Sequence, residues 1–68
     1  MLKMTLKAAR VNTGMDQKTA AQKLKVSNKT LGNWENGISA PKPDKIDLIC
    51  KLYNVKYDNL IFLTSNSL

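Results

Sequence analysis

Residues 28–36 combine the side chains best suited to recognising another molecule. If this stretch is a helix that begins after a serine cap, four positions share one face: Asn28, Lys29, Gly32 and Asn33. Leu31 and Trp34, three positions apart, form the opposite, apolar face. Asparagine pairs bidentately with adenine, and lysine donates to the acceptors of guanine. The segment therefore presents groups that suit the edges of nucleobases.

The charge of the chain favours a polyanionic partner. The 68 residues carry a formal net charge of +6. Residues 1–33 contain seven basic residues and one acidic residue, whereas residues 34–68 contain four of each, so the whole excess lies in the first half. A basic balance in a small domain favours nucleic acid first and an anionic membrane surface second. We expect the partner to dock on the first half.

Composition argues against catalysis and against a metal site. The chain has no histidine, one glutamate and four scattered aspartates, which excludes Ser–His and Cys–His pairs and imidazole zinc ligands. Cys50 is the only cysteine, and we interpret it as a small apolar residue on a helix face. No signal peptide and no window of roughly 18 apolar residues is visible. We expect a cytoplasmic protein without enzyme activity, cofactor, small-molecule ligand or membrane span.

Apolar spacing and cap residues predict five short helices and no strand, over residues 5–12, 17–24, 28–36, 43–53 and 57–62. The expected N-caps are Thr5, Asp16 and Ser27. Gly14, Gly37 and Asn54 suit left-handed helix ends, and Pro43 suits a first helical position. The run 60–63 resembles a strand, but we discount it because no partner strand is evident. We expect residues 64–68 to be frayed.

The connection between the second and third predicted helices is short. Only residues 25–27 separate them, which forces a steep crossing, and Ala20 and Ala21 supply small side chains for a close approach. This is helix-turn-helix geometry, in which the first helix spans the DNA backbone and the second enters the major groove.

Two stretches of sequence carry a family resemblance. They are Gln17-Lys18-Thr19-Ala20-Ala21 and Val26-Ser27-Asn28-Lys29-Thr30-Leu31-Gly32-Asn33-Trp34-Glu35-Asn36-Gly37. Together they resemble the phage-repressor and Cro (XRE-like) type of helix-turn-helix protein, and the match continues through Pro41, Ile46, Ile49, Val55, Asp58 and Leu60. The resemblance covers about residues 6–62. It implies an all-α, compact five-helix, lambda-repressor-like domain over residues 1–68, with the helix-turn-helix at about 16–37.

The resemblance also implies a function and a set of contacts. It implies a transcriptional regulator, of phage or prophage type, that binds double-stranded operator DNA. The expected base contacts are Asn28, Lys29 and Asn33, and Gly32 either makes none or lets a base or methyl group come close. The resemblance implies a phosphate contact for Gln17. We expect further phosphate contacts from Lys18, Lys25, Thr30 and Lys42.

Some positions bear on structure instead of contact with DNA. The resemblance implies that Arg10 and Glu35 form a structural ion pair. Trp34 is expected in the core, and Lys23 as an ordinary solvated charge. Lys25 stands where the family usually has glycine, which predicts an unusual turn. Asp16 replaces the usual Thr or Ser, and neither Lys42 nor Lys56 is a cap residue.

The oligomeric state and two other functions stay open at this point. Such proteins usually bind as two-fold dimers on half-sites about 34 Å apart. The expected weak homodimer contacts are Leu60, Phe62 and Leu63. The alternative function is a helix-turn-helix module for protein–protein interaction without DNA binding, which Asn28, Lys29 and Asn33 disfavour. An enzyme or a membrane-surface peptide is a third possibility, but no helix is both apolar and basic enough for a bilayer.

Overall fold

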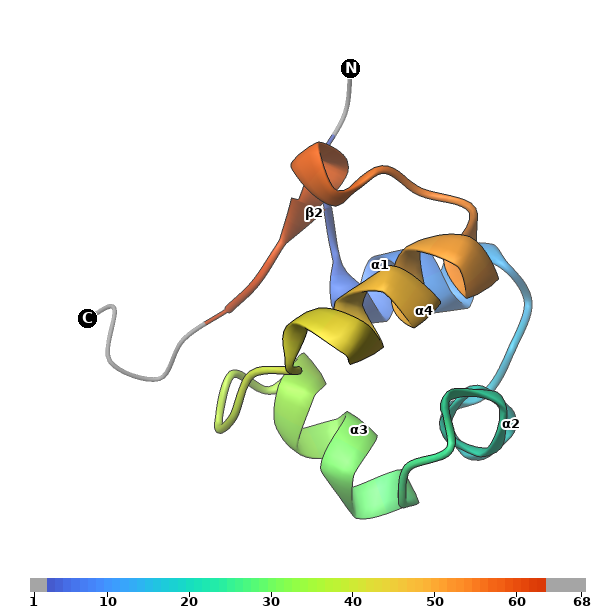
Figure 1. The fold of residues 1–68 in the computed structure, drawn as a ribbon. Coiled ribbons are helices and arrows are strands. Elements are labelled where there is room, and N and C mark those ends of the chain that lie inside the picture. The colour runs from blue at the N-terminus through green and yellow to red at the C-terminus, as the bar shows by residue number, and fades with distance from the viewer. Residues whose placement is uncertain (1–2, 64–68) are drawn as a thin grey trace.

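The computed structural model describes residues 3–63 and consists of four α-helices with a small strand pair (Figure 1). The helices are α1 (Leu6–Asn12), α2 (Gln17–Leu24), α3 (Asn28–Glu35) and α4 (Pro43–Tyr53). The strands are β1 (Met4–Thr5) and β2 (Leu60–Ile61). Figure 1 shows α2 nearly end-on and α3 from the side, so these two helices cross steeply. The tail expected to fray, residues 64–68, lies outside the described residues.

Side chains cap the first three helices where the sequence predicts. Thr5 Oγ1 accepts a hydrogen bond from the Ala8 amide at 3.1 Å. Asp16 Oδ1 accepts from the Thr19 amide at 2.8 Å, and Ser27 Oγ from the Thr30 amide at 3.0 Å. Each bond satisfies a backbone donor that has no partner inside the helix. The predicted starts of α1, α2 and α3 are therefore confirmed.

The ends of α2, α3 and α4 share one backbone motif. The residues with positive φ at these three ends are Lys25 (φ 60°), Gly37 (φ 76°) and Asn54 (φ 55°), and Gly14 (φ 85°) has a positive φ after α1. At each of the three ends the next amide donates to a carbonyl five residues back; the pairs are Val26 to Ala21, Ile38 to Asn33 and Val55 to Cys50. This is a Schellman motif, which satisfies carbonyls at the helix end. Helix α4 begins at Pro43 as predicted. Lys42 occupies the N-cap position, and its side chain makes no capping hydrogen bond.

The prediction of a fifth helix over residues 57–62 is wrong. Only Tyr57–Asn59 forms a helical turn, of the 3-10 kind, and Leu60–Ile61 is a strand parallel to β1. The register pairs Met4 with Leu60 and Thr5 with Ile61, and Figure 1 shows the two strands side by side. The described chain is therefore mostly helical but not all-α. The partner strand missing from the sequence argument is supplied by residues just before α1.

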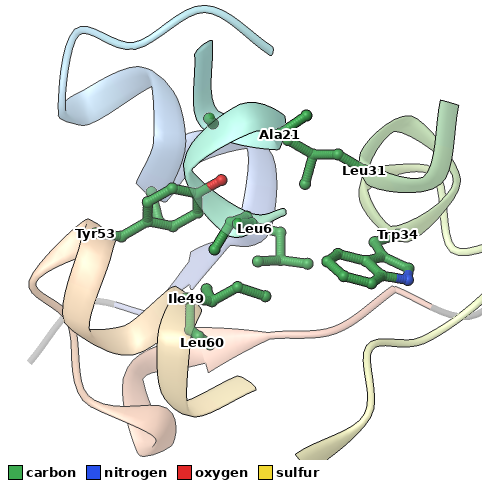
Figure 2. Close-up of a cluster of buried hydrophobic side chains, with 10 residues drawn as sticks. Leu6, Ala21, Leu31, Trp34, Ile49, Tyr53 and Leu60 are labelled. Carbon is green, nitrogen blue, oxygen red and sulfur yellow. The ribbon is translucent and has the colours of Figure 1, made fainter. Parts of the chain in front are cut away.

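The core gathers side chains from all four helices and from β2 (Figure 2). Its buried members are Leu6, Ala9, Ala20, Ala21, Leu24, Leu31, Trp34, Ile49, Tyr53 and Leu60. Leu24, Leu31 and Ile49 are completely buried. Burying an aliphatic side chain of this size stabilises the fold by about 1.5–3 kcal/mol, so these three residues fix α2, α3 and α4 against one another. Trp34 lies in this core, as the sequence predicts.

The helices between residues 3 and 63 are too short, or too polar, for any of them to cross a lipid bilayer.

Candidate nucleic-acid interface

The polar face of α3 is turned away from the core. Asn28 and Lys29 are exposed, and Gly32 and Asn33 are half-buried. On the opposite face Leu31 is completely buried and Trp34 is 7% exposed. Because these two side chains anchor α3, the four predicted base-contacting positions are held at the surface. The structure thus places together the residues that the sequence grouped.

The predicted phosphate-contacting lysines belong to three different segments. Lys18 lies in α2, Lys25 in the turn that follows it, and Lys42 directly before α4. All three residues are exposed. Lys23, which we interpret as an ordinary solvated charge, is exposed on α2 as well.

Thr30 takes part in the cap at the start of α3. Its amide donates to Ser27 Oγ, and its Oγ1 accepts a hydrogen bond from the Ser27 hydroxyl at 2.8 Å. The hydroxyl hydrogen of Thr30 remains available for an external acceptor such as a phosphate oxygen. The cap and the predicted contact are therefore compatible.

An ion pair joins α1 to the end of α3. Arg10 Nε donates to Glu35 Oε2 at 2.7 Å and Arg10 Nη2 donates to Glu35 Oε1 at 3.2 Å. The two side chains are only 8% and 3% exposed. Arg10 Nη1 also donates to the Met15 carbonyl at 3.0 Å, which ties in the loop before α2. The hydrogen bond to Glu35 raises the pKa of Arg10, so the guanidinium stays charged despite its burial.

Gln17 connects this ion pair to the start of α2. Its Nε2 donates to Glu35 Oε1 at 3.1 Å, and the residue is half-buried. Sequence reasoning expected Gln17 only as a phosphate contact and missed this bond. No local pattern marks a contact between residues 18 apart that lie on different helices. One amide hydrogen and Oε1 of Gln17 are left for an external partner.

The carboxylate of Asp16 forms the N-cap of α2. Hydrogen bonds from the Thr19 side chain and backbone lower the pKa of Asp16. The group therefore stays ionised at the N-terminus of α2, where the helix dipole favours a negative charge.

The turn between α2 and α3 contains a strained residue. Lys25 adopts the left-handed conformation with φ 60° and ψ 42°, which is unfavourable for a residue with a Cβ. Lys45 Nζ, from α4, donates to the Leu24 carbonyl at 2.8 Å. A cation at a helix C-terminus interacts favourably with the dipole, so Lys45 helps to hold this turn. No local pattern in the sequence indicates this contact, because the two residues are 21 positions apart.

The predicted dimer contacts need a correction at Leu60. This residue is 8% exposed and packs in the core, so its side chain is not available to a second copy. Phe62 is half-buried, whereas Ile61 and Leu63 are 41% and 47% exposed. The ring of Phe62 lies 5.9 Å from that of Tyr57, which is itself exposed. We use the name C-terminal apolar patch for four apolar residues near the end of the described chain: Tyr57, Ile61, Phe62 and Leu63.

Comparison with known proteins agrees with this geometry. A family model described as "Helix-turn-helix" matches residues 6–60. The chain is also similar to "HTH-type transcriptional regulator ImmR" of Bacillus subtilis (strain 168), with 41% identity over 56 residues. That alignment covers 82% of this chain and 44% of the relative, so the chain spans less than half of the relative's length. With α2 and α3 crossing at a short turn inside the matched region, the chain belongs to the helix-turn-helix family of the phage-repressor and Cro type.

Proposed function

We propose that this chain binds double-stranded DNA in a sequence-specific manner and regulates transcription as Cro and phage repressors do. The observation that carries the proposal is the outward polar face of α3, which Leu31 and Trp34 hold in place from behind. An α-helix fits the width of the major groove, and α3 follows a capped start and a short turn. The site of action is the bacterial cytoplasm, on the nucleoid or on prophage DNA.

Three side chains of α3 determine the sequence that is bound. Asn28 and Asn33 pair with adenine through their carboxamides, and Lys29 donates to guanine acceptors. Each good base contact contributes about 1–3 kcal/mol of discrimination against the wrong base.

Residues in and around α3 contact the DNA backbone. They are Gln17, Lys18, Lys25, Thr30 and Lys42. Such contacts set the register of the protein on the duplex without specifying its sequence. Support comes from the net charge of +6 and from the exposure of the three lysines.

The active species is a weak two-fold dimer that associates through the C-terminal apolar patch. Two-fold binding places equivalent α3 helices on half-sites one helical turn, about 34 Å, apart. Replacing Leu63 with Lys should abolish cooperative binding to paired half-sites, and Val11→Lys, at an exposed apolar residue of α1, is the matched control. Sedimentation equilibrium should show the same difference in self-association. Equal association of the two variants and the wild type would rule out this patch as the interface.

Selection of bound duplexes from a random oligonucleotide pool tests the proposed function. We expect a two-fold symmetric motif whose affinity falls steeply with salt, by a log–log slope of about 0.9 for each phosphate neutralised. A module that binds only proteins enriches no duplex. That result would favour the alternative of a helix-turn-helix domain used for protein–protein interaction.

A further inference from the structure

Gly32 lies in the middle of α3, and nothing inside the described fold requires a glycine there. Its backbone is not among the positive-φ residues, where the glycines are Gly14 and Gly37. A Cβ built at position 32 would meet its nearest heavy atom, Gln17 Nε2, at 3.5 Å, which is an ordinary van der Waals contact. Glycine inside a helix is less favourable than alanine. Neither backbone conformation nor internal space therefore explains the residue.

The same Cβ would lie against the polar end of Gln17. It would come within 3.6 Å of Gln17 Oε1 and 3.8 Å of Gln17 Cδ. Hydrogen bonds fix the position of the Gln17 carboxamide. Its Nε2 donates to Glu35 Oε1, and Arg10 Nε donates to Glu35 Oε2. A methyl group at position 32 would thus partly cover a fixed amide whose Nε2 keeps one hydrogen for an external acceptor such as a phosphate oxygen.

We propose that Gly32 is a positioning residue that keeps the Gln17 carboxamide accessible to a phosphate oxygen of the DNA. This inference rests on the proposed function and assigns Gly32 a role other than a base contact. Glycine serves where a backbone must approach a ligand closely, and here the missing side chain leaves the polar end of Gln17 uncovered on the side of α3. The hydrogen bond to Glu35 orients the amide, and Gly32 leaves it uncovered.

A double-mutant cycle tests the inference with four chains: wild type, Gly32→Ala, Gln17→Ala and the double variant. The probe is one duplex selected from a random pool by the wild type, and all affinities are measured at a temperature where each chain is folded. We expect Gly32→Ala to lower the unfolding equilibrium constant by about fivefold, because alanine is the better helix former. We expect the same change to weaken DNA binding by about tenfold, which corresponds to one hydrogen bond to a charged group.

The cycle also shows whether Gly32 acts through Gln17. In the Gln17→Ala background the Gly32→Ala change should cause no further loss of affinity, because no amide remains to be covered. Val11→Ala, which raises helix propensity on α1, is the control and should leave the affinity unchanged.

Three outcomes would overturn the inference. They are an unchanged affinity for Gly32→Ala, an equal loss in both backgrounds, and a less stable Gly32→Ala chain, which would mean that the fold itself needs the glycine. If the wild type enriches no duplex, the proposed function and this inference fail together. A wild type that binds and a Gly32→Ala variant that binds equally well overturn the inference alone.

Discussion

Three buried polar side chains, those of Arg10, Glu35 and Tyr53, differ in how well their hydrogen-bonding groups are satisfied. Arg10 donates to both oxygens of Glu35 and to the Met15 carbonyl, and Glu35 also accepts from Gln17. The hydroxyl of Tyr53 is buried and has no hydrogen-bond partner among residues 3–63. An unpaired buried polar group destabilises a fold, whereas a fully paired charge is stable until one partner is removed.

Replacing Arg10 with Met should destabilise the protein strongly. The change leaves the Glu35 carboxylate buried without its counter-ion, which is unfavourable by about 3–5 kcal/mol. Chemical denaturation measures the loss, and Lys7→Met is the matched control because Lys7 is an exposed cation on the same helix. If Arg10→Met unfolded at the wild-type denaturant concentration and lost only DNA binding, Arg10 would be a DNA contact instead of a structural residue.

Replacing Tyr53 with Phe should stabilise the protein at neutral pH by about 1 kcal/mol, because it removes an unpaired buried hydroxyl. Burial, aided by the nearby Glu35 charge, raises the pKa of Tyr53 to about 12. Because the pKa of Tyr53 is higher in the folded state than in the unfolded state, the fold loses stability as the pH rises. The loss begins near pH 10, the pKa of an unperturbed tyrosine, and continues toward pH 12. Tyr53→Phe should therefore unfold less readily than the wild type across this range.

The exposed Tyr57 provides the control for removal of a hydroxyl. Tyr57→Phe should leave the stability of the wild type at neutral pH unchanged, because Tyr57 is 58% exposed. Denaturation series at several alkaline pH values compare the three chains. Identical pH profiles for the wild type and Tyr53→Phe would contradict the burial of the Tyr53 hydroxyl.

At the scale of elements, local signals predicted α1 to α4 and failed for the strand pair. Caps such as Asp16 and Ser27 and the left-handed Asn54 act within a few residues, so the sequence displays them directly. The pairing of Met4 with Leu60 joins opposite ends of the described chain. A strand of two residues is too short to show a periodic pattern in the sequence. Its partner strand lies beside it only in the folded chain, where α1 and α4 are packed together.

Lys25 is the element-scale test, because it ends α2 in a conformation that glycine adopts more easily. Lys25→Gly should stabilise the fold by about 1 kcal/mol and weaken DNA binding through the loss of a phosphate contact. Asn54→Gly, at the other left-handed residue, should stabilise by a smaller amount, since asparagine tolerates this conformation, and should leave DNA binding unchanged. Thermal melts and affinity titrations measure both effects. A lower melting temperature for Lys25→Gly would mean that the lysine side chain stabilises the turn.

At the scale of the whole molecule, the sequence indicated the outer face of the site but not what supports it from inside. The polar and apolar faces of α3 follow from helical spacing, and the buried Leu31 and Trp34 agree with that prediction. The bonds from Gln17 to Glu35 and from Lys45 to the Leu24 carbonyl join segments far apart in sequence, so spacing could not reveal them. These contacts connect the core to the surface proposed to meet DNA.

The central claim is that the exposed start of α3 determines which DNA sequence is bound. Duplex selection from a random pool with the wild type, Asn28→Ala and Lys29→Ala tests it directly, with Lys23→Ala as the control for removal of an exposed charge. We predict that each α3 variant loses preference at one or two positions of the motif and that Lys23→Ala retains all of them. An unchanged motif for both Asn28→Ala and Lys29→Ala would contradict the claim.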